Sequence, residues 1–480
     1  MMNVLYVAQF HETCGYSHAS IGYLKSIHEY LKENKNINFK ILSLSLDPRK
    51  LTPSFHAGKT ENSVLKLFDK YHFTDDREFR EFVESDYKCI WHMTSVLPVI
   101  SKRTSKDNFY NKIDAKINEV ILGSTENYHI LAWETDKLPQ EYEQCIRQMA
   151  PVKVITPSEW NTKVIGEVFL TETIPHLIEP KNVTQEPINL PQDIEGKFVI
   201  LSISEWVNRK NFEALIRSFI LEFSTNEDCC LIIKTSLPQN IKKEMFVEMF
   251  NNIKNTTRTN TQKLQNIFVI LDYLSDSKMR YLYEKCDLFC LTSLGEGFSL
   301  PTSEAISLGK NVLCPDQGGH VDYITPENRY FVSGMWDTVF DVPPYDCDGK
   351  WYIPSIDNIR SKMKLAYDDW KNKNPLALEN IRNSTEILES GKFSRSFIGS
   401  RIIEAVSAVE EPKSKISILK RQLQNKTLKE KVSLLENSYA GQDCYILSCG
   451  PSLNDYDREK LKVFLKDKLV LSVKQAYDPF

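Results

Sequence analysis

The sequence lacks the features that mark several classes of protein. It has no apolar run near the ~20 residues that a membrane-spanning helix needs, and its first residues, MMNVLYVAQFHETCGYSH, lack the basic flank and long apolar stretch of a signal peptide. The 11 cysteines are an odd number, and none stands in a Cys-x-x-Cys pair. This pattern argues against a disulfide framework and against a metal site. We therefore expect a cytoplasmic protein with reduced thiols.

The sequence also has no excess of positive charge. Lys and Arg number 60 against 64 Asp and Glu, so the net charge is −4. Because nucleic acid requires a concentrated basic surface, we expect no nucleic-acid partner. What remains is an average globular composition, with 41% apolar and 26% charged residues over 480 positions. A chain of this length predicts about two to four domains.

Apolar runs of strand length alternate with helical patterns in two stretches of the chain. The first contains VLYVA, CIWHM, YHILAW and VKVIT, after which Ser158 is a predicted helix N-cap. The second contains FVILSIS, CCLIIKT, NIFVILD, DLFCLT and NVLCP. Such alternation is typical of parallel sheets covered on both faces. The sequence thus predicts an α/β fold with two Rossmann-like, doubly wound domains, 1–180 and 198–392, which face a cleft and are joined by a linker at 181–197.

The C-terminal part of the chain changes character more than once. Residues 393–411 predict a returning C-terminal helix. Residues 412–440 are rich in Lys, Glu, Gln and Leu at helical spacing, which predicts an amphipathic linker helix; a coiled coil or a helix lying on a membrane surface are the alternatives. Residues 441–480 predict a single β-α-β unit. A domain below ~40 residues rarely folds alone, so we expect a longer, bifunctional protein cut within a second domain.

The segment Asp287–His320, DLFCLTSLGEGFSLPTSEAISLGKNVLCPDQGGH, carries the most specific chemistry. A buried strand is followed by Gly-Glu-Gly with Glu296 at its centre, and Pro301 then opens a helix with Glu304 in its first turn. The N–H groups at a helix start favour phosphate oxygens, whereas carboxylates accept hydrogen bonds from sugar and ribose hydroxyls. The segment therefore predicts a nucleotide-sugar site beyond the strand ends. The alternative is that Glu304 complements the helix dipole and Glu296 is a solvated loop residue.

This segment strongly resembles the donor-binding signature of retaining glycosyltransferases of family 4, because it has their Glu-x7-Glu spacing. The segments HETCGYSHASIGYLKSI, ILAWETDKLP, VITPSEWN, ILSISEWVNRKNFEALIRSF and WYIPSIDNIRSKM also follow the order of that family. The resemblance covers about residues 3–408 and implies the GT-B fold. It further implies transfer of a hexosyl-type sugar from a nucleoside-diphosphate sugar to a glycan or lipid-linked glycan acceptor, with retention of configuration.

The resemblance also implies a biological setting. It points to assembly of bacterial surface polysaccharide (capsule or lipopolysaccharide) in the cytoplasm, with peripheral association at the inner face of the membrane. No cofactor and no metal is expected. Asp346 and Asp348 mimic the metal-binding Asp-x-Asp of another glycosyltransferase fold, but they follow no predicted strand. We expect them to form a turn.

Individual roles follow from the same resemblance. Glu304 would hold the donor ribose, Glu296 the transferred sugar, and Lys210 the diphosphate. The family usually has an arginine where this sequence has Glu205, so Arg209 is its substitute; the alternative for both cations is a solvated pair before a helix. The remaining donor-binding residues around the diphosphate are Gly297, Phe298, Ser299, Leu300, Pro301 and Thr302.

Four residues of the first domain complete the predicted site. Gly15 would approach the donor or acceptor, and His92 would lie near the reacting sugar, with a packed core histidine as the alternative. Trp133 and Glu134 are expected to face or support the cleft. Two rival functions remain open: a GT-B nucleotide-sugar epimerase, and a non-catalytic nucleotide-sugar-binding module of a larger protein.

A second, shorter resemblance lies at the C-terminus. The segments CYILSCGPSLNDYDREKL and LVLSVKQAYD resemble the opening β-α-β unit of bacterial sialyltransferase-like domains, whose Gly-Pro-Ser-Leu turn contacts a cytidine nucleotide. The matching residues are Gly450, Pro451, Ser452, Leu453 and Gln475. Cys449 and Lys474 depart from that pattern, which usually has Asn at these positions.

Overall fold

The computed structural model describes most of the chain up to residue 407 and two short segments beyond it. The described residues are 1–10, 15–43, 62–92, 120, 123–180, 183–190, 194–224, 226, 228–238, 240–257, 266–340, 342, 345, 349–407, 444–448 and 469–473. Internal contacts divide the chain into two compact units, Met1–Val406 and Ser407–Phe480. Within the described ranges, no helix has the length and apolar character needed to span a bilayer.

The first unit begins with a six-stranded parallel sheet in the order β2-β1-β3-β4-β5-β6. Its strands are β1 (Met2–Ala8), β2 (Ile37–Ser43), β3 (Tyr87–His92), β4 (Glu126–Ile130), β5 (Pro151–Thr156) and β6 (Thr171–Thr173). The strand order reverses between β1 and β3. In an open parallel sheet such a reversal creates a crevice at the carboxyl ends of the two strands.

Helices cover both faces of this sheet, and together they form the first domain. Alternate residues of β1 enter two cores: Val4 and Tyr6 pack with α1 (Gly15–Glu33) and α2 (Asn62–Tyr71). Leu5 and Val7 pack on the face of α3 (Asp76–Val83), α6 (Gln140–Gln148) and α7 (Glu159–Gly166). Ser158 caps α7, as its sequence predicted, because its side chain accepts from the N–H of Asn161.

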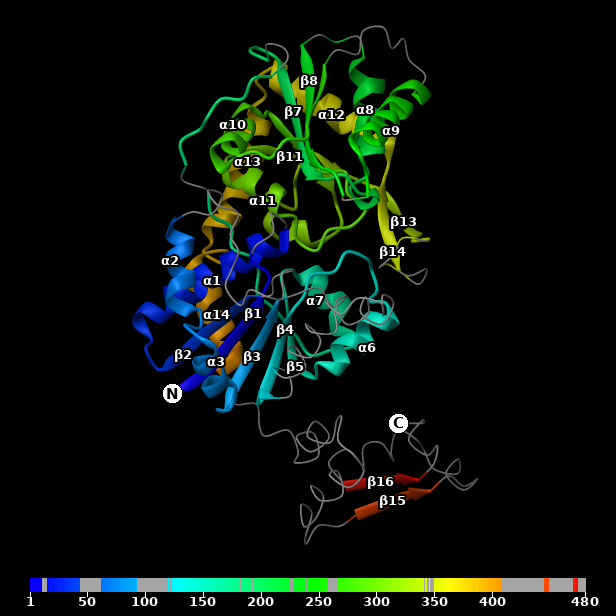
Figure 1. The fold of residues 1–480 in the computed structure, drawn as a ribbon. Coiled ribbons are helices and arrows are strands. Elements are labelled where there is room, and N and C mark those ends of the chain that lie inside the picture. Colours follow the sequence, from blue (N-terminus) through cyan, green and yellow to red (C-terminus); the bar gives the residue numbers. More distant parts are fainter. Residues whose placement is uncertain are drawn as a thin grey trace. The chain divides into compact units, whose positions relative to one another are not determined.

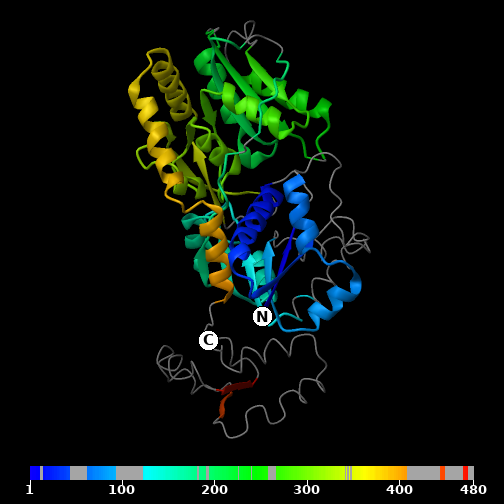
Figure 2. The ribbon, with the colours of Figure 1, turned by 90° about the vertical axis from the view of Figure 1, so that its left-hand side faces the viewer.

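The helix α14 (Arg395–Ser407) also belongs to the core of the first domain, although it lies over 200 residues beyond β6. Ile398 and Ile402 have no exposed surface and join the cluster of Val4 and Tyr6. Figure 2 shows α14 beside α1, and Gly399 allows this approach, since an added Cβ would lie 2.1 Å from the Ser26 carbonyl oxygen.

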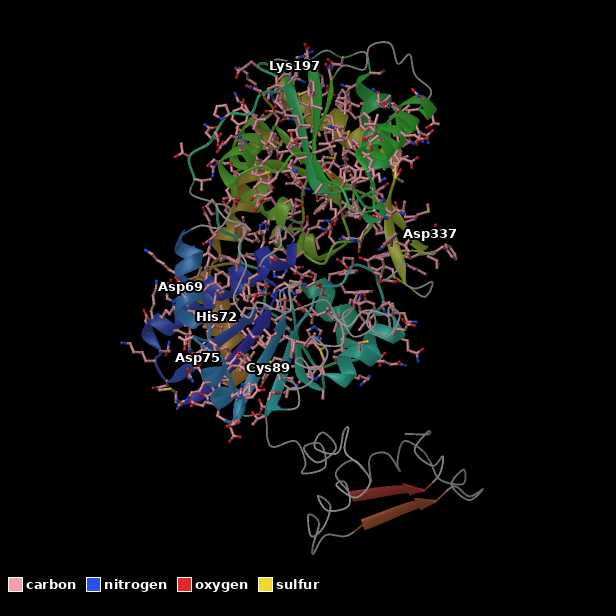
Figure 3. All side chains as sticks on the ribbon, viewed as in Figure 1. Asp69, His72, Asp75, Cys89, Lys197 and Asp337 are labelled. Carbon is pink, nitrogen blue, oxygen red and sulfur yellow. The ribbon has the colours of Figure 1, made fainter. Side chains whose placement is uncertain are left out.

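The second domain is built on another six-stranded parallel sheet, in the order β12-β11-β10-β7-β8-β9. Its strands are β7 (Phe198–Glu205), β8 (Cys229–Ser236), β9 (Ile267–Ile270), β10 (Leu288–Cys290), β11 (Asn311–Pro315) and β12 (Phe331–Val332). Lys197, just before β7, lies at the end of this sheet that is remote from the first domain (Figure 3). The order reverses between β7 and β10, whose carboxyl ends point toward the first domain (Figure 1).

Two apolar cores sandwich the second sheet. Phe198 and Ile200 pack with α8 (Phe212–Phe223), α9 (Lys243–Thr256) and α12 (Ile356–Lys371), while Val199 and Leu201 pack with α10 (Asp276–Lys285), α11 (Leu300–Ser307) and α13 (Pro375–Glu389). The adjacent Cys229 and Cys230 enter opposite cores, and like the other five described cysteines of the first unit they are free and buried. The predicted pair of doubly wound α/β domains is therefore confirmed.

Two features lie outside these sheets. The hairpin of β13 (Gly334–Thr338) and β14 (Lys350–Pro354) is antiparallel and was not predicted; Asp337 marks its position in Figure 3. In the second unit, β15 (Cys444–Ser448) and β16 (Leu469–Val473) pair in parallel, as a β-α-β unit requires. The helix expected between them and the linker helix expected at 412–440 lie outside the described residues.

Candidate functional site

The reversal between β7 and β10 brings two loops side by side. One loop contains the short 3-10 helix Asn208–Lys210 after β7, and the other follows β10 and contains Glu296. The N–H of Leu294 donates to the Arg209 carbonyl oxygen at 2.8 Å, which joins the loops directly. The topology thus places the two predicted cations and the first predicted carboxylate at the crevice where open α/β sheets bind ligands.

Glu296 forms the centre of a buried charged cluster at this point. Its side chain is almost wholly buried, and Lys210 Nζ lies 2.5 Å from Oε1. Arg209 Nη1 lies 3.3 Å from Oε2, and the Ser293 hydroxyl donates to Oε1 at 2.5 Å. Glu296 is therefore not a solvated loop residue, and Arg209 and Lys210 are not a solvated pair.

The charge states of the cluster follow from burial and mutual attraction. Burial alone would raise the pKa of Glu296, but Lys210 and Arg209 outweigh it and lower the pKa to about 2. Burial, together with the nearby Arg209, lowers the pKa of Lys210 below its ordinary value. Burial opposes the charge of Arg209 too, yet the nearby carboxylates, Glu134 foremost, raise its pKa. Glu296 is consequently ionised at neutral pH.

Arg209 links the two domains. Its Nη1 donates to the Gly295 carbonyl oxygen at 2.6 Å, and its Nη2 lies 3.4 Å from Glu134 Oε1, in the loop after β4. The Tyr345 hydroxyl, between β13 and β14, donates to the other oxygen of Glu134 at 3.1 Å. Sequence reasoning named Arg209 and Glu134 separately but missed Tyr345, whose loop PPYDCDGKW was interpreted only as a turn.

The glycines around Glu296 permit contacts that a side chain would block. A Cβ at Gly295 would lie 1.9 Å from the Glu134 carbonyl oxygen, and a Cβ at Gly319 would lie 1.9 Å from the Gly297 carbonyl oxygen. The Ser158 hydroxyl, from the first domain, donates to that same oxygen of Gly297 at 2.8 Å. The loop of Glu296 is therefore packed backbone-to-backbone against the first domain.

The start of α11 has a strained geometry. Ser299, its N-cap, has φ of 65°, a left-handed conformation that L-residues other than glycine rarely adopt. Its hydroxyl lies 2.8 Å from Thr302 Oγ1, and its carbonyl oxygen accepts from the Tyr323 hydroxyl at 2.7 Å. The helix begins at Leu300, so Pro301 is its second residue.

Glu304 lies in the second turn of α11, which corrects the prediction that it lies in the first. The cause is the helix start at Leu300, which makes Glu304 the fifth helical residue. Its Oε2 accepts from the Tyr283 hydroxyl at 2.9 Å, from the neighbouring helix α10. Glu304 and Tyr283 both line an open pocket, whose other lining residues are Glu179, Asp276, Met279, Arg280, Ser307 and Leu308.

His92 ends β3 and is enclosed by the first domain. It is 1% exposed, with Nδ1 2.8 Å from the Tyr6 hydroxyl and 3.1 Å from the Ser20 hydroxyl. Burial lowers its pKa well below the ordinary histidine value, so its ring is neutral. His176 lies between His92 and the loop of Glu296. Its ring centroid is 6.2 Å from that of His92 and 4.8 Å from that of Phe298. These contacts fit the alternative interpretation of His92, in which it is a packed core histidine.

Gly15 and Trp133, which were also predicted to belong to the site, differ in how closely other parts of the chain pack against them. Gly15 starts α1, and nothing lies within 4 Å of a Cβ built there, so no close approach to another part of the described chain is seen. Trp133 is buried, donates from Nε1 to Thr135 Oγ1 at 2.6 Å, and lies 5.3 Å from the ring of Tyr345. Trp133 therefore supports the segment that contacts Arg209.

The remaining predictions concern metal binding and the C-terminal unit. Asp346 and Asp348 lie outside the described residues, and so do the C-terminal residues 449–453, 474 and 475. In the described part of the chain, no group of three or more His, Cys, Asp or Glu side chains is arranged to hold a metal ion.

Part of the second domain is similar to a known protein family. Residues 186–336 match the family model described as "Glycosyl transferases group 1", and this segment contains Arg209, Lys210, Glu296 and Glu304. No curated protein sequence is significantly similar to the chain.

Similar solved structures cover most of the chain at low identity. HepE of Anabaena in complex with UDP is 14% identical, with 85% of this chain and 100% of that chain covered at a TM-score of 0.52. The trehalose-6-phosphate synthase OtsA is 12% identical, with the same coverage and TM-score. An α,α-trehalose-phosphate synthase (UDP-forming) from Burkholderia xenovorans, in complex with glucose-6-phosphate, is 9% identical, with 85% and 100% covered at 0.51. The chain therefore has the GT-B fold, with a region similar to glycosyl transferases group 1 in its second domain.

Proposed function

We propose that this chain is a retaining glycosyltransferase that moves a hexosyl-type sugar from a nucleoside diphosphate to a glycan acceptor. One observation carries the proposal: Glu296, ionised and buried, lies against Lys210 and Arg209 at the β7/β10 reversal. This cluster falls within the segment that matches glycosyl transferases group 1.

The chemistry of transfer fits the charges of these residues. As the glycosidic bond breaks, the departing nucleoside diphosphate gains negative charge, and cationic side chains that are already in place stabilise that charge. Lys210 and Arg209 provide the cations, and the start of α11 at Leu300 provides N–H groups. Glu296 would accept hydrogen bonds from the transferred sugar, and Glu304 from the ribose. In this scheme the cations take the place of a metal bridging the diphosphate.

The proposal includes an acceptor and a setting, which rest on the family resemblance. We infer a glycan or lipid-linked glycan acceptor, and a role in bacterial surface polysaccharide assembly at the inner face of the membrane. The proposed catalytic residues are Glu296, Glu304, Lys210 and Arg209. We also propose that His92 lies near the transferred sugar, although its contacts in the free protein are those of a packed residue.

A panel of labelled nucleotide sugars, with and without glycan acceptors, tests the proposal. Slow donor hydrolysis that becomes transfer when an acceptor is added supports it, and NMR of the product gives the anomeric configuration. An epimerised donor would indicate the epimerase, and binding without turnover the non-catalytic module. Glu304→Ala should reduce turnover by orders of magnitude, while Glu386→Ala, at a 64% exposed side chain on α13, should not. Full activity in a correctly folded Glu304→Ala protein would contradict the site assignment.

A further inference from the structure

Tyr283 is a buried polar residue that neither the sequence nor the comparisons assign to the site. It lies on α10, is 2% exposed, and packs in the core on the α10/α11 face of the second sheet. Its hydroxyl lies 2.9 Å from Glu304 Oε2 and 3.1 Å from the Pro301 carbonyl oxygen. The hydroxyl therefore touches both the start of α11 and the second carboxylate of the proposed donor site.

The phenol of Tyr283 acts as a permanent hydrogen-bond donor. Burial, reinforced by the negative charge of Glu304, raises the pKa of Tyr283 well above its ordinary value, so the hydroxyl keeps its proton throughout the physiological range. A phenol has a single hydrogen to donate. A hydrogen bond to a carboxylate is stronger than one to a neutral carbonyl, so the geometry favours Glu304 over Pro301 as the acceptor.

We propose that Tyr283 is a positioning residue, whose hydroxyl holds the carboxylate of Glu304 in the orientation that receives the 2′-hydroxyl of the donor ribose. This inference rests on the proposed function. A free glutamate side chain loses rotamer entropy when it is fixed. Because Tyr283 fixes Glu304 before the ligand arrives, that cost does not fall on ligand binding.

The inference predicts an effect confined to the ribose. Tyr283 lines the pocket beside Glu304, and the hydroxyl, which is its only polar side-chain group, lies 2.9 Å from the Glu304 carboxylate. Loss of the hydroxyl should therefore weaken recognition of a ribose 2′-hydroxyl and leave a 2′-deoxy ligand nearly unaffected. A purely structural tyrosine would affect both ligands alike.

The experiment compares Tyr283→Phe with Tyr281→Phe, a control on the same helix whose ring lies 5.8 Å from Lys285 Nζ. Calorimetry measures the affinity of each protein for UDP, GDP and ADP and for their 2′-deoxy counterparts. For the ribonucleotide that the unaltered protein binds best, Tyr283→Phe should lose roughly three- to tenfold in affinity. The 2′-deoxy form should change by less than about twofold, and Tyr281→Phe should match the unaltered protein. With a donor sugar, KM should rise by the same factor while kcat stays within about twofold.

A double-mutant cycle with Glu304→Ala, which removes the acceptor of the Tyr283 hydroxyl, separates positioning from folding. In the Glu304→Ala background, Tyr283→Phe should no longer change the ratio of ribose to deoxyribose affinity. Equal losses for both nucleotides, no loss in Tyr283→Phe, or an unchanged effect in the Glu304→Ala background would each overturn the inference. If the unaltered protein binds none of the three nucleotides, the proposed function falls and this inference with it. If it binds and prefers ribose but Tyr283→Phe has no effect, only the inference falls.

Discussion

Replacing Glu296 by glutamine should produce a loss of stability that depends on pH in a defined way. The substitution keeps the shape of the side chain but removes the negative charge between Lys210 and Arg209. Those interactions outweigh burial and lower the pKa of Glu296 from 4.5 to about 2. A difference of this size corresponds to about 3 kcal/mol of folding free energy at neutral pH.

The sign of the pH dependence follows from the direction of the shift. Because the pKa is lower in the folded protein, the stabilisation is fully present above the unfolded value and disappears as pH falls through the folded value. The free-energy difference between the unaltered protein and Glu296→Gln should be about 3 kcal/mol at pH 7 and pH 5. It should fall to about 1.4 kcal/mol at pH 3, because Glu296 is then protonated in the unfolded chain but still mostly ionised in the folded protein.

Urea denaturation followed by tryptophan fluorescence, at pH 7, 5, 4 and 3, measures this difference. Glu213→Gln is the matched control, since Glu213 is 60% exposed and pairs with Arg217 on the surface of α8. That control should differ from the unaltered protein by no more than about 0.5 kcal/mol at each pH. A Glu296→Gln difference that stays constant from pH 5 to pH 3, or that is below about 1 kcal/mol at pH 7, would refute the electrostatic reasoning.

Three further outcomes are expected. Lys210→Ala should weaken binding of a nucleoside diphosphate by roughly tenfold to hundredfold and binding of the nucleoside much less, as calorimetry can show; equal losses would contradict a diphosphate contact. Gly319→Ala should cost about 1–3 kcal/mol in denaturation, because its Cβ would lie 1.9 Å from the Gly297 carbonyl oxygen, whereas Gly15→Ala, with nothing within 4 Å, should leave stability unchanged. Activity should survive EDTA, because Lys210 and Arg209 supply the positive charge; loss on chelation that manganese restores would favour Asp346 and Asp348.

The sheets could be predicted because their strands carry a strong local signal. Runs such as FVILSIS and CCLIIKT are apolar on both faces, which only a strand covered by helices on two sides requires. Cys229 and Cys230 illustrate the point, since adjacent strand residues enter opposite cores. The carboxylates were found for a similar reason: Glu296 and Glu304 stand in one continuous segment at a strand end.

The parts that were missed depend on contacts between distant segments. β13, with the sequence GMWDT, has no alternation of apolar residues, and its partner β14 lies beyond an intervening loop. The contacts of Glu134 with Arg209 and Tyr345 join residues about 75 and 211 positions apart. No local pattern encodes such contacts. The error over Glu304 has a different origin, because Pro is favourable at either of the first two helical positions and does not fix the first residue.

The position of α14 has a consequence for the order in which the protein folds during synthesis. The first domain supplies its sheet by Thr173, yet Ile398 and Ile402, which complete one of its two cores, leave the ribosome over 200 residues later. At typical rates of translation this delay is about 10–45 s. During that interval all strands of the second sheet are synthesised, while the apolar surface of the first domain that Ile398 and Ile402 cover remains open. The domain that is made first is therefore expected to be finished last, and the nascent chain needs protection at that surface until Val406 has emerged.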